Sequence, residues 1–456
     1  HCQRAQKYAR AVTPRPALLI GIMSCIGLIA LKRPFHKIMT GTLKPILGYL
    51  MLAAGAGVIV SNLDPLGKMI EHGFHITGVV PNNEAIVAVA QKVLGVETMS
   101  ILVVGLLMNL CIARFTKFKY VFLTGHHSLF MACLMSAVLG TAGLSGMELI
   151  LVGGFLMGAW SAISPAIGQS YTSKVTDGDE IAIGHFGSLG YYLSACVAKY
   201  VGKAEDSTED IEIPEKWGFL RDSTLSTALT MIVFYLIAAF AAGSEFVATL
   251  SGDMSPYLYA VMSAMNFAVG VTIVYSGVRM ILGDLIPAFQ GIATKIIPNA
   301  IPAVDCAVFF TYAPTAVVLG FLSSFIGGII GMLILGAVGG VLIIPGLVPH
   351  FFCGATAGIY GNATGGRRGA AVGAFLNGLA ITFLPALALP VLGQLGFQNT
   401  TFGDADFAVM GLVLGNAYEW VGMAGIYGIV AIAALVLIVP NFIKTKGKVI
   451  NYVEED

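Results

Sequence analysis

The sequence predicts an all-α protein that crosses a membrane many times. Of its 456 residues, 57% are hydrophobic and 11% are charged, and the mean hydropathy is +0.84. A soluble domain carries roughly 25% charged and about 45–50% apolar residues, so water cannot solvate this much apolar surface. The 56 glycines are typical of membrane helices, because small residues let such helices approach closely. Apolar runs between charged turns indicate about ten or eleven membrane segments.

Charge, cysteines and motifs exclude several classes of function. The formal net charge is zero, so we predict no nucleic-acid partner. The 7 cysteines form no C-x-x-C pair and lie mostly in apolar runs, where a thiol packs as a small hydrophobic group. The sequence contains neither a Walker A loop nor an H-E-x-x-H motif. We therefore predict that the chain does not hydrolyse ATP and holds neither a metal nor a cofactor.

The first half of the chain alternates apolar runs with basic or polar turns. Apolar runs cover residues 16–31, 46–60, 99–113, 121–139 and 148–167. A transmembrane helix needs about 20 mainly apolar residues, so the shorter runs predict tilted, extended or partial crossings. The semi-polar residues 62–98 predict an interfacial or re-entrant helical segment that starts again near Asn82 and Asn83.

Residues 170–190 predict a re-entrant hairpin. The turn residues Thr176, Asp177 and Gly178 separate two apolar arms, and the second arm carries His185. Irregular backbone is tolerated at membrane depth where it lines a cavity or is buried in protein. The hairpin is therefore a candidate part of a binding site.

The second half resumes after the charged residues 201–222. Its apolar runs cover residues 223–242, 257–281, 321–344, 351–363, 370–392, 407–418 and 422–439, with an amphipathic connection at 284–298. Lysine and arginine cluster at residues 32–37, 114–119, 199–221, 367–368 and 444–448. Cytoplasmic loops carry an excess of these residues, so we predict that residues 201–222 form a cytoplasmic connection and residues 441–456 a cytoplasmic tail.

A weak internal symmetry relates residues 16–200 to residues 223–440. Each half has two spans, an amphipathic connection, a break, another span and then a histidine after a turn. The breaks and histidines are Pro81-Asn82-Asn83 and Ala313-Pro314-Thr315, with His126 and His350. Paired breaks point to a binding site between inverted repeats. We therefore predict a single membrane domain, residues 1–456, built from two inverted repeats.

Asp305 is the main candidate for a ligand-binding residue. It lies in the otherwise apolar run of residues 295–320, eight residues before Ala313-Pro314. A charge at the bilayer centre costs roughly 3 kcal/mol or more, and such groups face the protein interior or a polar cavity. Two interpretations follow: a carboxylate that faces a substrate pathway, which we favour, and one that ties two helices together.

Other polar residues at the breaks form a candidate site with Asp305. They are Asn82, Asn83, His126, His127 and His185. Amides and neutral imidazoles both donate and accept hydrogen bonds, and a carboxylate accepts them, so the set suits a small polyol or an organic anion. The alternative to ligand binding is a packing role for each histidine and a helix-capping role for each asparagine. Phe130 and Phe186 lie beside the histidines and either contact the ligand or belong to the core.

Four stretches of sequence resemble the ascorbate-type IIC component of the bacterial phosphotransferase system. They are LTGHHSLF, KVTDGDEIAIGHF, IPAFQGIATKIIPNAIPAVDCAVFFTYAPTAVVLGF and LIIPGLVPHFFCGATAGIYGNATGGRRGA. The resemblance extends over residues 16–439. It implies a multi-pass protein of the bacterial cytoplasmic (inner) membrane, a homodimer surrounded by lipid. Each protomer is expected to have eleven transmembrane helices, a substrate-binding core domain and a V-shaped scaffold domain.

The resemblance also implies a mechanism. The substrate would be L-ascorbate, or a closely related sugar acid or polyol, carried by elevator-type movement of the core domain. Separate IIA and IIB proteins would be the partners, and IIB would phosphorylate the substrate from its own phosphocysteine. Whether this chain counts as an enzyme is left open, because the phosphoryl donor lies on IIB.

Three residues match the family's ligand residues: His126, His185 and Asp305. Asp305 is expected to orient the substrate hydroxyl or to accept its proton. Asn82 and Asn83 lie where ascorbate members have a threonine and a tyrosine.

Three further positions differ from ascorbate members. Phe130, Phe186 and Ala53 each stand where those members have a glutamine. The differences affect hydrogen bonds to the ligand, so they bear on the identity of the substrate.

A different class of function fits the same residues. An ion-coupled secondary transporter of a small organic anion or polyol would use Asp305 and the histidines as proton carriers. A passive channel is disfavoured, because several helix breaks surround one acid.

Overall fold

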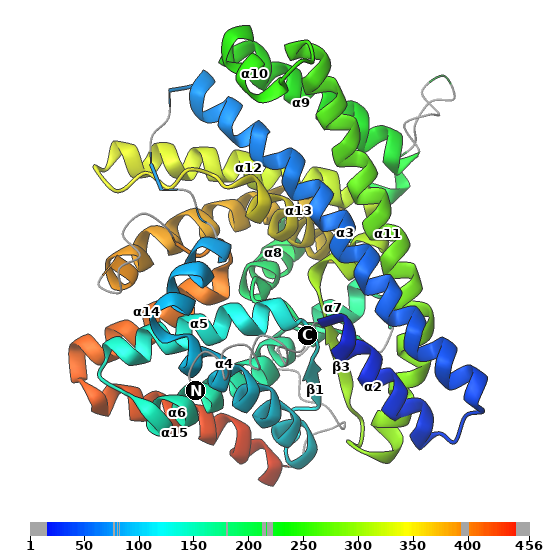
Figure 1. Ribbon diagram of the computed structural model, residues 1–456, viewed down its shortest axis with the longest axis vertical. Helices are drawn as coiled ribbons and strands as arrows, with labels where there is room; N and C mark the ends of the chain where they lie inside the picture. Colours follow the sequence, from blue (N-terminus) through cyan, green and yellow to red (C-terminus); the bar gives the residue numbers. More distant parts are fainter. Residues whose placement is uncertain are drawn as a thin grey trace.

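The computed structural model describes residues 16–75, 78–79, 81, 83–178, 181–211, 216, 222–393 and 401–443. This part of the chain is mainly helical (Figure 1). Its helices are α2 (Pro16–Ala30), α3 (Phe35–Gly73), α4 (Asn83–Phe115), α5 (Gly125–Thr141), α6 (Gly146–Ile167), α7 (Gln169–Val175), α8 (Ser188–Val201), α9 (Ser223–Ala242), α10 (Ser244–Ser251), α11 (Pro256–Lys295), α12 (Pro314–Ala337), α13 (Leu347–Gly393), α14 (Ala405–Val421) and α15 (Met423–Ile438). Short 3₁₀ helices are η1 (Thr208–Asp210), η3 (Cys306–Thr311) and η4 (Val439–Phe442).

The described helices confirm a polytopic membrane protein. Seven of them are long and apolar enough to cross a membrane, or eight if the bent pair formed by α9 and α10 makes one span. Helix α13 contains a further break, because the backbone of Gly365 and Gly366 is not helical. This break lies where the sequence indicates a basic turn. The count of eleven spans stays a prediction.

Two predicted connecting segments are instead parts of long helices. Helix α3 continues through residues 62–73, and α11 continues through residues 284–295. With 39 and 40 residues, these helices are about 58–60 Å long at 1.5 Å per residue. That is about twice the thickness of the hydrocarbon core. Their ends can therefore carry charge without a break in the helix, as the pair of Lys44 and Asp284 does at 3.7 Å.

A small parallel sheet, which the sequence did not predict, lies among the helices. Its strands are β1 (Tyr120–Phe122), β2 (Ala182–Ile183) and β3 (Ile301–Val304), in the order β1-β3-β2. Phe122 and Ala182 both pair with Ala303 in the central strand. Strands this short and apolar resemble helical sequence, and their pairing partners lie far apart in the chain.

The helices fall into two groups. One group contains α2, α3, α9, α10 and α11, which pack mainly on one another. The other group contains two sets, α8 with α12 and α13, and α4 with α5 and α6, and α14 contacts both sets. Figure 1 shows α3 and α11 running side by side along one flank of the molecule, with α5, α6, α14 and α15 on the other. The small sheet and its flanking helices lie between.

Paired glycines hold α3 against α11. A Cβ on Gly48 would lie 2.7 Å from the carbonyl oxygen of Gly277, and one on Gly277 would lie 2.6 Å from that of Gly48. Gly55 and Gly270 meet in the same way, one heptad further along α3. No side chain fits between backbones this close. The pairing fixes α3 and α11 as one rigid unit.

We expect Gly48→Ala to lower the apparent melting temperature of the purified protein in detergent. The added methyl group must push two helices apart, which costs about 1–3 kcal/mol in a packed interior. Gly57→Ala is the matched control, because Gly57 also lies in α3 and nothing lies within 4 Å of its Cβ position. A Gly48→Ala protein that melts with the control would contradict the close packing.

Candidate functional site

The three strands of the small sheet end beside the three principal site residues. Asp305 directly follows β3, His185 follows β2 after one residue, and His126 lies in the first turn of α5, just beyond β1. Adjacent parallel strands point their carboxyl ends to the same edge of a sheet, where ligands commonly bind in α/β folds. Residues from three distant parts of the sequence are thereby brought together.

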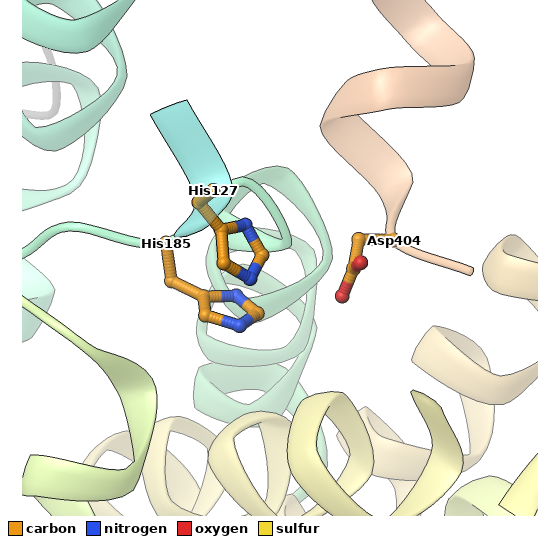
Figure 2. A group of neighbouring side chains, drawn as sticks. All are labelled: His127, His185 and Asp404. Carbon is orange, nitrogen blue, oxygen red and sulfur yellow. The ribbon is translucent and has the colours of Figure 1, made fainter. Parts of the chain in front are cut away.

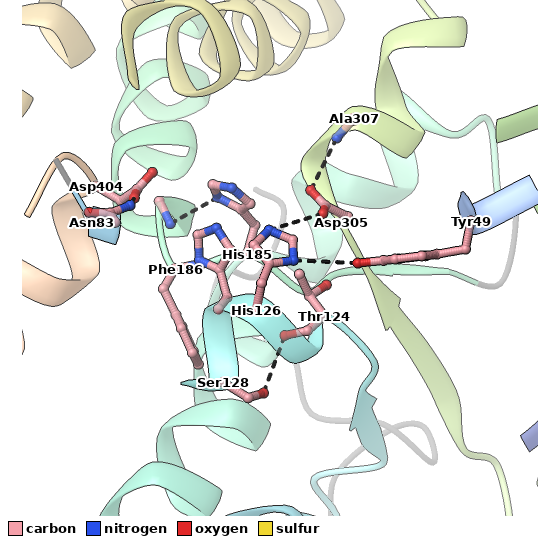
Figure 3. Close-up of polar contacts among 12 residues, drawn as sticks. Tyr49, Asn83, Thr124, His126, Ser128, His185, Phe186, Asp305, Ala307 and Asp404 are labelled. Carbon is pink, nitrogen blue, oxygen red and sulfur yellow. Dashed lines mark hydrogen bonds and ion pairs between the residues drawn. The ribbon is translucent and has the colours of Figure 1, made fainter. Parts of the chain in front are cut away.

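Asp305 lies where β3 gives way to η3. Its backbone is extended, and its carboxylate accepts a hydrogen bond of 3.5 Å from the backbone N–H of Ala307. The second carboxylate oxygen lies 3.4 Å from Nε2 of His126 (Figure 3). A carboxylate has about four acceptor positions, so Asp305 keeps capacity for a ligand.

His126 connects the site to the long helix α3. Its Nδ1 lies 3.4 Å from the hydroxyl of Tyr49 in α3, and its side chain is 40% exposed. Figure 3 shows one ring nitrogen of His126 in contact with Tyr49 and the other in contact with Asp305. His126 therefore lies where the two groups of helices meet.

His127 and His185 pack closely against each other inside the site, with their rings tilted by 44°. Their ring centroids are 3.7 Å apart, and both side chains are buried. Nδ1 of His127 accepts from the backbone N–H of Phe186, and Nδ1 of His185 accepts from that of Gly187. A backbone N–H can only donate, so we assign the proton of each neutral ring to Nε2. Both rings therefore keep an Nε2–H as their free polar group.

A second carboxylate, Asp404, completes this side of the site. Figure 2 shows it beside the rings of His127 and His185, and one ligand atom from each of the three residues lies within 4.8 Å of the others. Asp404 is buried and precedes the first turn of α14. It accepts hydrogen bonds from Nδ2 of Asn83 (2.6 Å) and from the thiol of Cys353 (2.7 Å).

The neighbouring acid Asp406 has a different role. Its carboxylate accepts from the hydroxyl of Ser188 (2.8 Å), the backbone N–H of Leu189 (3.0 Å) and Nε1 of Trp160 (3.2 Å). Ser188 and Leu189 form the first turn of α8, where unpaired N–H groups and the helix dipole favour an anion. Asp406 thus holds α8 against α14, and only Asp404 of the two acids lines the cavity described next.

A cavity of about 1060 Å³ joins these residues. His126, His127, His185, Asp305 and Asp404 form its polar wall. The cavity also follows α3, because Tyr49 and Glu71 both line it. Twenty-two residues of helix span roughly 33 Å, so the cavity is a long passage with the polar wall near one end.

The other residues predicted to bind ligand have distinct positions. Phe130 lines the cavity. The Phe186 side chain is fully buried, stacks on Phe122 at 4.6 Å and points away from Asp305 (Figure 3). Asn83 lines the cavity, but its amide is used by the protein: it accepts from the backbone N–H of Gly403 at 2.9 Å and donates to Asp404. Asn82 lies outside the described residues.

Sequence reasoning included His127 among the candidate residues but missed Asp404. Asp404 stands at the end of a polar turn, and its partner Asn83 is 321 residues away in the chain. The available signal was a pair of acids, Asp404 and Asp406, at the start of an apolar run. An acid at the start of a helix is an ordinary cap, so the pair of acids did not distinguish a helix cap from a ligand-binding residue.

Two groups in the site have the donor types of a metal centre. They are His127, His185 and Asp404, and His185, Asp305 and Cys306. A metal ion needs a free nitrogen lone pair. In His127 and His185 the Nδ1 lone pair already accepts a backbone N–H, and Nε2 carries the proton. Metal binding would therefore break these bonds, and the arrangement serves better as a pair of hydrogen-bond donors.

Comparison with known proteins adds an independent observation. Residues 11–406 match the family model EIIC-GAT, described as the PTS system sugar-specific permease component. A protein of Mycoplasma pneumoniae named "Ascorbate-specific PTS system EIIC component" is 28% identical over 410 residues. The match covers 76% of this chain and 61% of the relative, so the chain spans about three fifths of the length of that relative.

We expect Zn²⁺ to leave the melting temperature of the purified protein unchanged. A ligand that binds the folded state raises its stability, and the protonated Nε2 atoms leave no lone pair for the ion. His185 belongs to both candidate groups, so His185→Phe is the control for zinc bound elsewhere, such as at the exposed Cys111 and Cys196. A zinc-dependent increase that disappears in His185→Phe would contradict the assigned proton positions.

Proposed function

Because the chain belongs to the family of sugar-specific permease components of the phosphotransferase system, we propose that it carries a small hydroxylated substrate across the bacterial cytoplasmic membrane. The substrate is L-ascorbate or a closely related sugar acid or polyol. A separate IIB protein, itself recharged by IIA, phosphorylates it. The observation that carries the proposal is the convergence of His126, His185 and Asp305 on one cavity at the edge of the small sheet.

Each of these residues has a separate role in the proposed mechanism. The imidazole N–H groups of His126 and His185 donate to substrate oxygens, and the carboxylate of Asp305 accepts from a substrate hydroxyl. When the phosphoryl group moves from the IIB cysteine to that hydroxyl, the hydroxyl loses its proton, and Asp305 is positioned to take it. The phosphorylated product is more highly charged and cannot return through the apolar part of the membrane.

Movement of one helix group against the other would expose the site to each side in turn. We propose α2, α3, α9, α10 and α11 as the scaffold domain, because glycine contacts fix α3 to α11. The small sheet and the remaining helices would form the mobile core domain. The bond between Tyr49 and His126 crosses between the two groups, so it must break when the core moves. Rigid-body movement of this kind suits an inverted repeat, and we extend the proposal to a homodimer.

One observation favours a second function. The contact of 3.4 Å between His126 and Asp305 could carry a proton, as in ion-coupled secondary transporters. The two functions differ in their energy source: phosphoryl transfer through IIB, or an ion gradient.

We expect Asp305→Asn to reduce substrate uptake at least tenfold, equivalent to about 1.4 kcal/mol or more. The amide cannot accept the substrate proton, and its NH₂ group faces the donors that a carboxylate would accept. Uptake would be measured in proteoliposomes supplied with IIA, IIB and the general phosphocarrier proteins. Asp64→Asn is the matched control, because Asp64 lines the same cavity roughly 22 Å further along α3.

Two results would contradict the proposal. Unchanged binding and uptake in Asp305→Asn would make Asp305 a structural residue. Concentrative uptake driven by a proton or sodium gradient, without IIB, would replace the phosphotransferase function with secondary transport.

A further inference from the structure

Asp404 places a second carboxylate on the wall of the cavity that contains Asp305. We propose that Asp404 is a substrate-binding residue, and that it makes the site selective for uncharged polyhydroxylated ligands, such as pentitols and hexitols, over anionic sugar acids. This inference rests on the proposed function, because it concerns the substrate of the same site.

The hydrogen bonds of Asp404 leave acceptor positions free. One oxygen accepts from Asn83 and the other from the thiol of Cys353. Both partners are donors, so together they orient the carboxylate without satisfying it: two of about four acceptor positions remain. Asn83 is a positioning residue in this arrangement, since its amide also holds the backbone of Gly403.

The neighbouring histidines complete a subsite for a hydroxyl group. His127 and His185 each present an Nε2–H, and their ligand atoms lie within 4.8 Å of the Asp404 carboxylate. A hydroxyl group both accepts and donates a hydrogen bond. It can accept from an imidazole Nε2–H and donate to Asp404 at the same time. The carboxylate of a ligand can accept but not donate, so it would leave Asp404 unsatisfied and face a like charge.

Charge along the cavity favours the same class of ligand. The described lining contains four acids, Asp64, Glu71, Asp305 and Asp404, but one basic residue, Lys68. Lys68 lies on α3 among Asp64 and Glu71, nineteen residues or roughly 28 Å beyond Tyr49. A cleft lined mainly by one sign of charge repels ligands of that sign. Ascorbate and hexuronates are anions at neutral pH, whereas polyols are not.

Phe130 fits a ligand of this kind. It lines the cavity and packs edge-on against His126, with ring centroids 5.8 Å apart. An aromatic ring can cover the C–H surface of a polyol, while the hydroxyl groups turn to the carboxylates and histidines. A glutamine at this position would instead supply another pair of polar groups.

The test is equilibrium binding to the purified full-length protein by isothermal titration calorimetry. The ligands are a panel of pentitols and hexitols, with L-ascorbate and D-glucuronate titrated in the same buffer. We expect at least one polyol to bind at least about tenfold more tightly than either anion, the discrimination that sites with paired polar groups achieve. Tighter binding of an anion, or binding of no polyol, would overturn the inference. This comparison uses the wild-type protein and does not depend on how any variant folds.

Two variants then assign the selectivity to Asp404. Asp404→Asn is expected to weaken polyol binding at least about tenfold, because its amide NH₂ faces donors. The ratio of the polyol affinity to the anion affinity is expected to fall as well. Glu71→Gln removes the same charge from the same cavity, roughly 33 Å along α3 from Tyr49. It is expected to change the affinity for the polyol by less than about twofold. An equal effect of the two variants would overturn the role of Asp404 in direct binding.

The outcome separates this inference from the proposed function. Uptake that depends on IIB but prefers ascorbate overturns the inference alone. Polyol binding that depends on Asp404, in a protein whose uptake follows an ion gradient without IIB, supports the inference and overturns the phosphotransferase mechanism.

Discussion

The small parallel sheet is the constraint on which the site depends. Backbone that is neither helical nor paired cannot remain unsatisfied inside a membrane protein. Strands β1 and β2 both hydrogen-bond to β3, so three non-helical segments satisfy one another instead of requiring water. Because they are parallel, their ends align, and His126, His185 and Asp305 follow at one edge. The same strand pairing therefore satisfies the backbone hydrogen bonds and brings the polar residues together.

The rest of the structure supports that edge from two directions. Asp406 anchors the first turn of α8, which directly follows His185 and the Phe186-Gly187 segment. Asn83 anchors the segment before α14, where Asp404 lies. The glycine-packed helices α3 and α11 form the opposite side, and Tyr49 of α3 reaches His126 across the boundary. A site built at the boundary between a rigid unit and a second unit can bind substrate and respond to relative movement.

Much of the site followed from the sequence, but part of it could not. Asp305 was selected because a charge in an apolar run is costly. A break in a helix was predicted at Ala313-Pro314-Thr315, and α12 begins there with Pro314 in its first turn. The sheet was missed because its strands are two to four residues long and apolar. The length of α3 was missed because the charges near its end are typical of a separate interfacial or re-entrant segment. Asp404 was missed because its place in the site depends on contacts with Asn83 and His127. These residues are distant from it in the sequence and come close to it only after folding.

The most direct test of the account is a cryo-electron microscopy structure of the protein with its substrate bound. Ligand density is expected at the edge of the sheet, within hydrogen-bond distance of Asp305, His185 and Asp404, with the apolar face of the ligand on Phe130. Density elsewhere in the cavity, such as beside Asp64 and Glu71 along α3, with the edge of the sheet left free, would contradict it.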